Sequence, residues 1–246
     1  MASLKPYVRI YDNLDVLSLA AAAVFVEASE EAVSGRGRFL VAVSGGTTPV
    51  PLYELLAKAP YRAQVDWSLT HVFWGDERCV PAEDLQNTYR QVYDLLLGRV
   101  PIPAGNVHRV RTELEPGEAA ADYALELRKF AIAPFAWPRF DLVLLGMGSD
   151  GHTASLFPGS IEPQGAPVLA VTGQYEDRPA QRVTLSSEVF NSARTVMFLV
   201  SGKGKADVLK RVLYGASRPE NLPGQRIHPP EGKVIWMVDR DAASLL

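Results

Sequence analysis

Asp150 and His152 are the residues whose types and spacing best suit catalysis in this sequence. An imidazole titrates near neutral pH, so one ring can both take and return a proton. A neighbouring carboxylate can orient the ring or stabilise its charged form. The pair lies in a loop that also contains Gly146, Gly148 and Gly151. The pattern predicts an acid–base pair, and a tight turn with a structural histidine is the alternative.

The apolar run at residues 142–145 directly precedes this loop. Four consecutive branched apolar residues are typical of a strand that is buried on both faces, as in a parallel sheet. Open α/β sheets bind their ligands beyond the carboxyl ends of the strands. We therefore expect the aspartate and the histidine to lie at that edge of the sheet.

A second candidate site follows the apolar run at residues 39–43 and is a loop of glycines and hydroxyl residues, Gly45, Gly46, Thr47 and Thr48. Pro49 then suits the first turn of a helix. A strand, such a loop and a helix N-terminus form the arrangement in which backbone N–H groups hold a phosphate. The loop is neither a Walker A motif nor a dinucleotide fingerprint, so a simple helix cap stays open as the alternative.

Charged residues follow two further apolar runs. Residues 75–79, Gly-Asp-Glu-Arg-Cys, come directly after the run at 71–74, and residues 201–205, Ser-Gly-Lys-Gly-Lys, come after the run at 195–200. Both groups fall at the expected carboxyl ends of strands, which favours a role in the site, and solvated loops are the alternative. Asn87 suits either a contact with this site or the cap of a helix.

Strand-like runs alternate with helical patterns along the chain, which predicts an α/β fold with one doubly wound, mostly parallel sheet flanked by helices. We expect a single domain over residues 1–246. The predicted strands are 7–10, 39–43, 71–74, 142–145, 168–171, 182–185, 195–200 and 234–238. The predicted helices start at Asp12 or Asn13 and run to about 33, and then follow at 87–97, 118–133 and 206–214. We expect a polar loop at 172–180 and a connection at 101–115 with His108 on the surface.

The composition restricts the class of protein. The 246 residues are 47% hydrophobic and 22% charged, which is ordinary for a globular protein. The net charge of -3, without a dense run of Lys or Arg, argues against nucleic acid. The single cysteine, Cys79, excludes an intrachain disulfide and fits a reducing compartment. With no apolar segment typical of a signal peptide or a membrane span, we expect a cytoplasmic protein without membrane partners.

Five segments, in this order, resemble those of the 6-phosphogluconolactonase family: SGGTTP at 44–49, WGDER at 74–78, GMGSDGHTASLFPG at 146–159, RVTLS at 182–186 and SGKGKA at 201–206. The resemblance extends along the whole chain and is far more specific than any one segment. It implies a Rossmann-like sheet shared with the glucosamine-6-phosphate deaminases. It also implies hydrolysis of 6-phospho-D-glucono-1,5-lactone to 6-phosphogluconate, the second step of the oxidative pentose phosphate pathway.

The resemblance further implies roles for individual residues. His152 matches the family's general base and Asp150 the acidic residue beside it. Arg78 matches a substrate-contacting arginine, and Asp76 is a second candidate for substrate binding. The phosphate end of the site is matched by Gly45, Gly46, Thr47, Thr48, Arg182 and Lys205. Thr47 stands where Ser is common, which keeps the hydroxyl.

No cofactor is implied, because the sequence has no clustered His/Cys metal-ligand set and no sign of nicotinamide chemistry. The expected partner is the small sugar-phosphate lactone, and we expect a monomer or a weak homodimer.

Three other functions stay open. A sugar-phosphate isomerase or deaminase on the same scaffold would carry a glutamate five residues beyond His152, where this chain has Phe157. A cysteine hydrolase would use Cys79, with Arg78 lowering the pKa of the thiol. A non-catalytic sugar-phosphate sensor would keep the pocket without the chemistry, which the presence of His152 with Asp150 disfavours.

Overall fold

The computed structural model describes residues 7–173 and 179–246. Among them, seven strands form a parallel sheet in the order β1-β10-β9-β6-β2-β3-β5. Their bounds are Tyr7–Tyr11 (β1), Phe39–Val43 (β2), Thr70–Trp74 (β3), Val107–His108 (β5), Leu142–Leu145 (β6), Thr195–Val200 (β9) and Lys233–Asp239 (β10). The chain winds outward from β2 toward one edge and from β6 toward the other. The predicted doubly wound sheet is confirmed.

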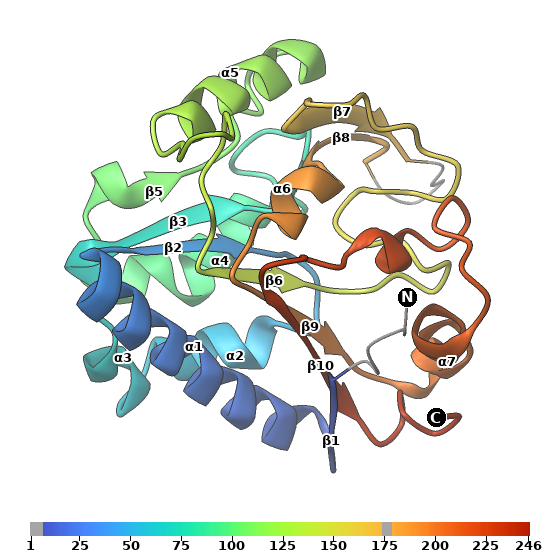
Figure 1. The fold of residues 1–246 in the computed structure, drawn as a ribbon. Coiled ribbons are helices and arrows are strands. Elements are labelled where there is room, and N and C mark those ends of the chain that lie inside the picture. The colour runs from blue at the N-terminus through green and yellow to red at the C-terminus, as the bar shows by residue number, and fades with distance from the viewer. Residues whose placement is uncertain (1–6, 174–178) are drawn as a thin grey trace.

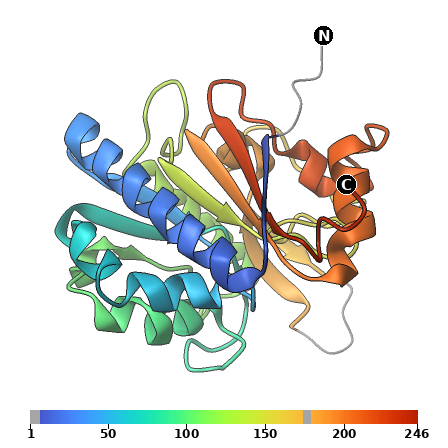
Figure 2. The same cartoon turned by 90° about the horizontal axis from the view of Figure 1, so that it is seen from below.

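Helices cover both faces of this sheet (Figure 1). On one face lie α1 (Leu14–Arg36), α2 (Val50–Leu56), α3 (Tyr61–Gln64) and α4 (Thr88–Leu95), and Figure 2 shows α1 crossing the sheet diagonally. On the other face lie α5 (Pro116–Arg128), α6 (Ser187–Asn191) and α7 (Ala206–Tyr214). Short 3₁₀ turns occur at η1 (Trp67–Leu69), η2 (Leu97–Arg99), η3 (Ala104–Asn106), η4 (Lys203–Lys205) and η5 (Pro223–Arg226).

The sheet separates two apolar cores, and β2 contributes to both. Phe39, Val41 and Val43 pack against α1 and α2, whereas Leu40 and Ala42 pack into the core beneath α5. This alternation is the two-residue period of a strand. All five side chains are buried, which explains why the strand is continuously apolar in the sequence.

A second sheet corrects the expectation that all strands join one sheet. Its strands are β4 (Asp76–Arg78), β8 (Gln181–Leu185) and β7 (Val168–Thr172), and both pairings are antiparallel. The charged residues of β4 form a strand instead of the expected loop, and three polar residues show no alternation of apolar side chains that would predict one. Their partners in β8 lie about a hundred positions away in the chain, so no local pattern could reveal the pairing. Residues 174–178 of the predicted loop at 172–180 lie outside the described residues.

Two other expectations are wrong. The predicted helix at 118–133 ends at Arg128, because the next three N–H groups bond to carbonyls three residues back instead of four, which tightens the chain into a turn. His108 was expected on the surface, but it is 7% exposed and lies on β5. Its ring stacks on Phe73 with centroids 4.3 Å apart, an interaction between neighbouring strands that the sequence could not show.

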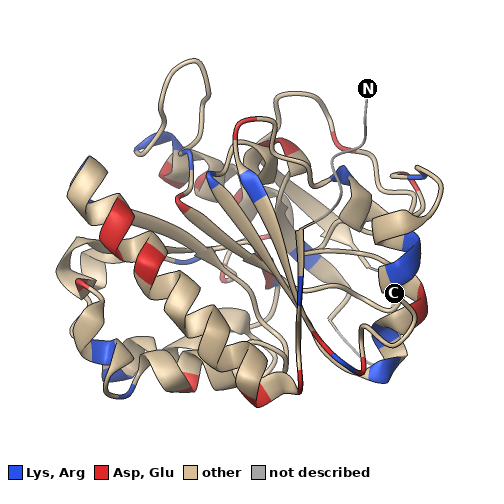
Figure 3. Ribbon diagram, turned by 60° about the horizontal axis from the view of Figure 1, so that its bottom comes forward, with Lys and Arg blue, Asp and Glu red and all other residues tan. Residues whose placement is uncertain are grey.

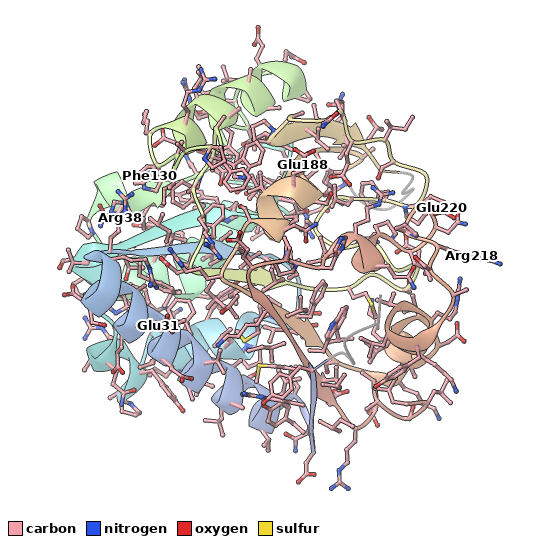
Figure 4. All side chains as sticks on the ribbon, in the orientation of Figure 1. Glu31, Arg38, Phe130, Glu188, Arg218 and Glu220 are labelled. Atoms are coloured by element: carbon pink, nitrogen blue, oxygen red, sulfur yellow. The ribbon has the colours of Figure 1, made fainter. Side chains whose placement is uncertain are left out.

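The buried His108 belongs to a polar chain at this edge of the sheet. Its Nε2 lies 3.0 Å from Nδ1 of His71, and its Nδ1 lies 2.9 Å from a carboxylate oxygen of Glu126. Arg38 stacks over the Phe130 ring beside them, with its Cζ 5.4 Å from the ring centroid (Figure 4). Burial, together with the charges of His108 and Arg38, lowers the pKa of His71 to about 4.

Most charged residues lie on the helices and loops (Figure 3). β2, β6 and β9 contain no charged residue at all. Within residues 7–173 and 179–246, no helix has the length and apolar character needed to cross a lipid bilayer.

The lowered pKa of His71 predicts a pH-dependent stability. The free energy of unfolding should fall as the pH drops from about 6.5 toward 4, because the unfolded ring, with its ordinary pKa of about 6.5, binds protons that the folded ring excludes. His71→Gln removes this contribution, so its stability deficit relative to wild type should shrink between pH 7 and pH 5 in urea titrations. The exposed His228→Gln is the control. A deficit that does not change with pH would contradict the assignment.

Candidate active site

A cavity of about 480 Å³ lies where β2 and β6 end. These neighbouring strands belong to the two halves of the sheet that wind in opposite directions, and such a switch point is where open α/β sheets bind ligands. The loops that follow β2, β6 and β9 contribute to the walls, together with residues of β4 and β8. All ten residues that the sequence analysis selected line this cavity, namely Gly45, Gly46, Thr47, Thr48, Asp76, Arg78, Asp150, His152, Arg182 and Lys205.

Asp150 and His152 form a hydrogen-bonded pair in the loop after β6. The Nδ1 atom of His152 lies 2.5 Å from Oδ1 of Asp150, which also accepts the backbone N–H of His152 at 3.1 Å. A carboxylate at Nδ1 favours the tautomer that carries its proton there, so Nε2 is the basic nitrogen. The side chain of His152 is 22% exposed, which leaves it accessible from the cavity. The pair can therefore act as a general base.

The ionisation state of Asp150 suits this arrangement. Burial raises the pKa of its carboxyl group, but the hydrogen bonds and the charge of His152 outweigh burial and lower the pKa to about 2. The carboxylate is consequently ionised at neutral pH. It can hold the ring in one orientation and stabilise the imidazolium that forms when His152 accepts a proton.

Two glycines give the loop its shape. A Cβ atom on Gly148 would lie 2.1 Å from Nδ1 of His152 and 2.6 Å from Oδ1 of Asp150, so any side chain at this position would displace the pair. Gly151 has a φ of 87°, in the left-handed region that favours glycine, and packs against Leu222. The glycines that surround the pair in the sequence are therefore required for its geometry.

Two arginines line the cavity from β4 and β8. Arg78 and Arg182 are directly opposite one another in the antiparallel register. Arg78 is positioned by a hydrogen bond from Nη1 to the carbonyl of Gln86 (2.9 Å), and the 6% exposed Arg182 donates from Nε to the carbonyl of Pro179 (3.0 Å). Two guanidinium groups that line the same cavity attract the negatively charged groups of a ligand. The pair therefore favours an anionic ligand.

Asp76 lies on β4, two residues before Arg78, and also lines the cavity. Its Oδ2 accepts a hydrogen bond from the buried hydroxyl of Ser155 at 2.7 Å. Ser155 follows His152 by three residues, so this bond ties the loop after β6 to the second sheet. The bond fixes the orientation of the carboxylate, which lines the cavity and can accept further hydrogen bonds.

Glu77, between Asp76 and Arg78, points away from the cavity. It is fully buried, and its carboxylate accepts the backbone N–H groups of Arg78, Thr88 and Tyr89, each at 2.7 Å. Two of these donors are the first residues of α4, so the side chain joins β4 to that helix. Burial raises the pKa of Glu77 to about 7, although the three hydrogen bonds act in the opposite direction.

Lys205 lies on η4 and reaches the cavity from the loop after β9, and Ser201 of that loop lines it as well. Asp239, at the end of β10, accepts hydrogen bonds from the hydroxyl of Ser201 and the backbone N–H of Gly202. This loop is therefore fixed by a buried carboxylate from the neighbouring strand. Lys203 does not line the cavity.

Several residues outside the predicted set complete the cavity wall: Ser44, Pro49, Thr88, Gly146, Met147, Gly148, Ser149, Ala154 and Ser201. Most belong to the loops already identified in the sequence. Thr88 does not, because it comes from α4 and no motif marked it. Its neighbour Asn87 caps that helix, with its Oδ1 accepting the N–H of Arg90 at 3.1 Å.

Cys79 does not line the cavity. Burial and the charge of Glu77 raise the pKa of its thiol to about 11, so it is protonated at neutral pH. In the part of the chain that the structure describes, no group of three or more His, Cys, Asp or Glu side chains could hold a metal ion. The acid–base pair is therefore the best-supported reactive centre.

Comparisons with known proteins agree on one family. A family model described as "Glucosamine-6-phosphate isomerases/6-phosphogluconolactonase" matches residues 12–236. A protein named 6-phosphogluconolactonase from Synechocystis sp. is 36% identical over 243 residues, which cover 98% of each chain. A "Probable 6-phosphogluconolactonase 2" from Oryza sativa subsp. indica is 34% identical over 255 residues, covering 97% of this chain and 89% of the rice protein.

Solved structures resemble the fold closely. The 6-phosphogluconolactonase from Trypanosoma brucei superposes with a TM-score of 0.88 at 29% identity, covering 99% of this chain and all (100%) of that one. A monomeric glucosamine-6-phosphate deaminase superposes with a TM-score of 0.82 at 18% identity, covering 98% of this chain and 100% of the other. The second likeness shows a shared fold alone.

The hydrogen bonds of Glu77 predict its importance for stability. Glu77→Ala leaves three buried backbone N–H groups without an acceptor and should lower the free energy of unfolding by about 3 kcal/mol. Urea denaturation at pH 7 measures the loss. The exposed Glu83→Ala, in the loop before α4, is the matched control and should change stability little. Equal losses in both variants would show that Glu77 does not anchor the helix.

Proposed function

The chain belongs to the glucosamine-6-phosphate isomerase/6-phosphogluconolactonase family, and we propose that it hydrolyses 6-phospho-D-glucono-1,5-lactone to 6-phospho-D-gluconate. This reaction is the second step of the oxidative pentose phosphate pathway. The observation that carries the proposal is the hydrogen-bonded Asp150–His152 pair, which shares one cavity with two arginines and a glycine loop. An acid–base pair beside an anion-binding wall is what a phosphorylated lactone requires.

His152 acts as the general base in the proposed mechanism. Its Nε2 takes a proton from a water molecule, and the resulting hydroxide attacks the lactone carbonyl carbon. The carbonyl oxygen becomes negatively charged, and Arg78 or loop N–H groups stabilise that charge. The carbon–oxygen ring bond then breaks, and the imidazolium returns its proton to the ring oxygen as it leaves. Asp150 holds the ring in place and stabilises its charged form.

The phosphate of the substrate binds at the other end of the cavity. Arg182 and Lys205 supply positive charge, and the loop from Gly45 to Thr48 supplies N–H and hydroxyl donors. These contacts lie away from the reacting carbonyl. Their binding energy therefore serves to orient the ester carbon toward His152.

Nothing at the site favours a deaminase reaction. The residue five positions beyond His152 is Phe157, where the deaminases carry a glutamate for ring opening. The rings of Phe157 and His152 have centroids 5.3 Å apart, so an aromatic side chain occupies the neighbourhood of the base. A lactone hydrolase needs no carboxylate at that place.

We also propose that the protein acts in the cytoplasm as a monomer or weak homodimer, as its composition and the family resemblance led us to expect. The name of one relative, "6-phosphogluconolactonase 3, chloroplastic" from Arabidopsis thaliana, places that protein in the chloroplast. Fractionation of the source cells tests the location of this chain, and analytical ultracentrifugation tests its assembly.

Loss of the general base should abolish most of the activity. His152→Ala should lower turnover by about 10²–10⁴-fold, the range expected for a positioned base, without unfolding the partly exposed loop. Proton release after the addition of freshly generated 6-phosphogluconolactone measures the rate, corrected for unaided hydrolysis. His228→Ala, at an exposed histidine outside the cavity, is the matched control. Near-normal turnover in His152→Ala would remove this residue from the role.

Removal of a phosphate contact should affect one substrate selectively. Arg182→Ala should raise KM for the phosphorylated lactone by about tenfold or more, the worth of one charge-assisted contact, because Arg182 lines the cavity and binds the phosphate in the proposed complex. KM for unphosphorylated gluconolactone should change little. Arg128→Ala, at an exposed arginine on α5, is the control. Equal effects of Arg182→Ala on both lactones would rule out the phosphate assignment.

A further inference from the structure

The glycine loop of the cavity is held by two side chains that each bind both backbone groups of one loop residue. The hydroxyl of Tyr53 accepts the N–H of Ser44 at 3.2 Å and donates to its carbonyl at 2.6 Å. The amide of Gln91 accepts the N–H of Gly46 at 3.1 Å and donates to its carbonyl at 2.9 Å. Tyr53 lies on α2, directly after the loop, whereas Gln91 comes from α4.

Gln91 acts at the point where the loop is most easily deformed. Gly46 has a φ of 95°, a conformation that glycine adopts at little cost but that it does not retain without support. The preceding Gly45 lies so close to Thr88 of α4 that a Cβ atom would be 2.7 Å from the threonine methyl group. The first two turns of α4 therefore form the surface on which the loop rests.

The two side chains also decide which N–H groups remain for a ligand. Tyr53 and Gln91 occupy those of Ser44 and Gly46. Within the described part of the chain, no acceptor is assigned to the N–H groups of Gly45, Thr47 and Thr48, and all three residues line the cavity. Backbone N–H groups that converge on one point form an anion-binding nest, and these three are available for that role.

We propose that Gln91 is a positioning residue that fixes Gly46 so that the neighbouring N–H groups of the loop converge on the substrate phosphate. The proposal rests on the function proposed above for its identification of the phosphate as the ligand. Gln91 itself does not line the cavity and acts through the loop. None of the five sequence motifs contains Gln91.

The same helix ties the phosphate loop to the second sheet. Glu77 binds the N–H groups of Thr88 and Tyr89 at the start of α4, and Gln91 lies one turn later. The neighbours of Glu77 on β4 are Asp76 and Arg78, which face the cavity. α4 is thus a rigid connection between the glycine loop and the wall that carries the arginines.

The test compares Gln91→Ala and Gln91→Glu with Asp94→Ala, a control at an exposed position of the same helix. Calorimetry measures the affinity of each protein for inorganic phosphate. Steady-state kinetics give KM and kcat for the phosphorylated lactone and for gluconolactone. We expect Gln91→Ala to weaken phosphate binding and to raise KM for the phosphorylated lactone by about tenfold each, the equivalent of about one lost contact. KM for gluconolactone and both kcat values should stay within about twofold.

Gln91→Glu keeps the shape of the side chain and the acceptor for the Gly46 N–H, but it places a carboxylate oxygen against the Gly46 carbonyl. It should therefore weaken phosphate binding at least as much as alanine does, and it serves as the test if thermal unfolding shows that Gln91→Ala is not folded. Phosphate affinity within twofold of wild type in the folded variants would overturn the proposal. Equal losses for the two lactones would overturn it too, as would a wild-type protein that does not bind phosphate.

The two proposals fail in different ways. A wild-type protein that binds inorganic phosphate but does not hydrolyse the phosphorylated lactone would refute the proposed function. If the Gln91 variants still lost phosphate affinity in that case, the positioning role would stand for an anion of another kind. Normal lactonase activity with unchanged phosphate binding in the variants would leave the function intact and refute the positioning role.

Discussion

Each loop of the cavity begins where a parallel strand ends, and there the backbone loses the hydrogen-bond partners that neighbouring strands supply. Buried side chains replace them. Tyr53 binds both backbone groups of Ser44 after β2, and Tyr123 does the same for Trp74 at the end of β3. Burial raises the pKa of both phenols, so each hydroxyl keeps the proton that it donates. The loops that follow are rigid because their first residues are fixed on both sides.

The same principle extends from hydroxyls to carboxylates. Glu77 and Asp239 are both buried, and each accepts several hydrogen bonds from the chain around it. Burying a carboxylate is unfavourable unless such bonds compensate. Here the groups that compensate belong to the start of α4 and to the loop after β9, which carries Lys205. If the start of α4 or the loop after β9 moved, Glu77 or Asp239 would lose these bonds and remain buried without compensation. The two carboxylates therefore help to fix the geometry of the cavity.

The cavity combines charges that the whole chain does not reveal. The net charge is -3, yet Arg78, Arg182 and Lys205 meet in one place from three separate elements. The same cavity is lined by Asp150, which is ionised and holds His152 through Nδ1. The site therefore combines groups that attract an anion with a pair that can move a proton. In the proposed reaction, binding of the anion orients the reacting carbon toward His152.

Much of this organisation follows from local patterns in the sequence. The apolar runs predicted six of the seven strands of the parallel sheet to within one residue at each end, since a strand buried on both faces must be apolar throughout. The seventh, β5 at Val107–His108, lies in the segment expected to be a connection, because two residues are too few to show a pattern. The family motifs selected ten residues, which the structure brings to one cavity, because the ends of parallel strands meet at one edge. Asn13 was a candidate for the start of α1, and its side chain caps that helix by a bond to the N–H of Val16, which depends only on neighbouring residues.

Tertiary structure alone decided the rest. The pairing of β4 with β8, the burial of His108 and the contact of Gln91 with Gly46 each join segments that are far apart in the chain. Such contacts depend on where the sheet brings polar residues together. The order of polar residues along the chain does not show which distant residue each of them will contact. The sequence by itself determined which residues follow the strands. Only the folded chain determined which of them face one another across the cavity and which hold the others in place, because hydrogen bonds between distant segments depend on the packing of the whole molecule.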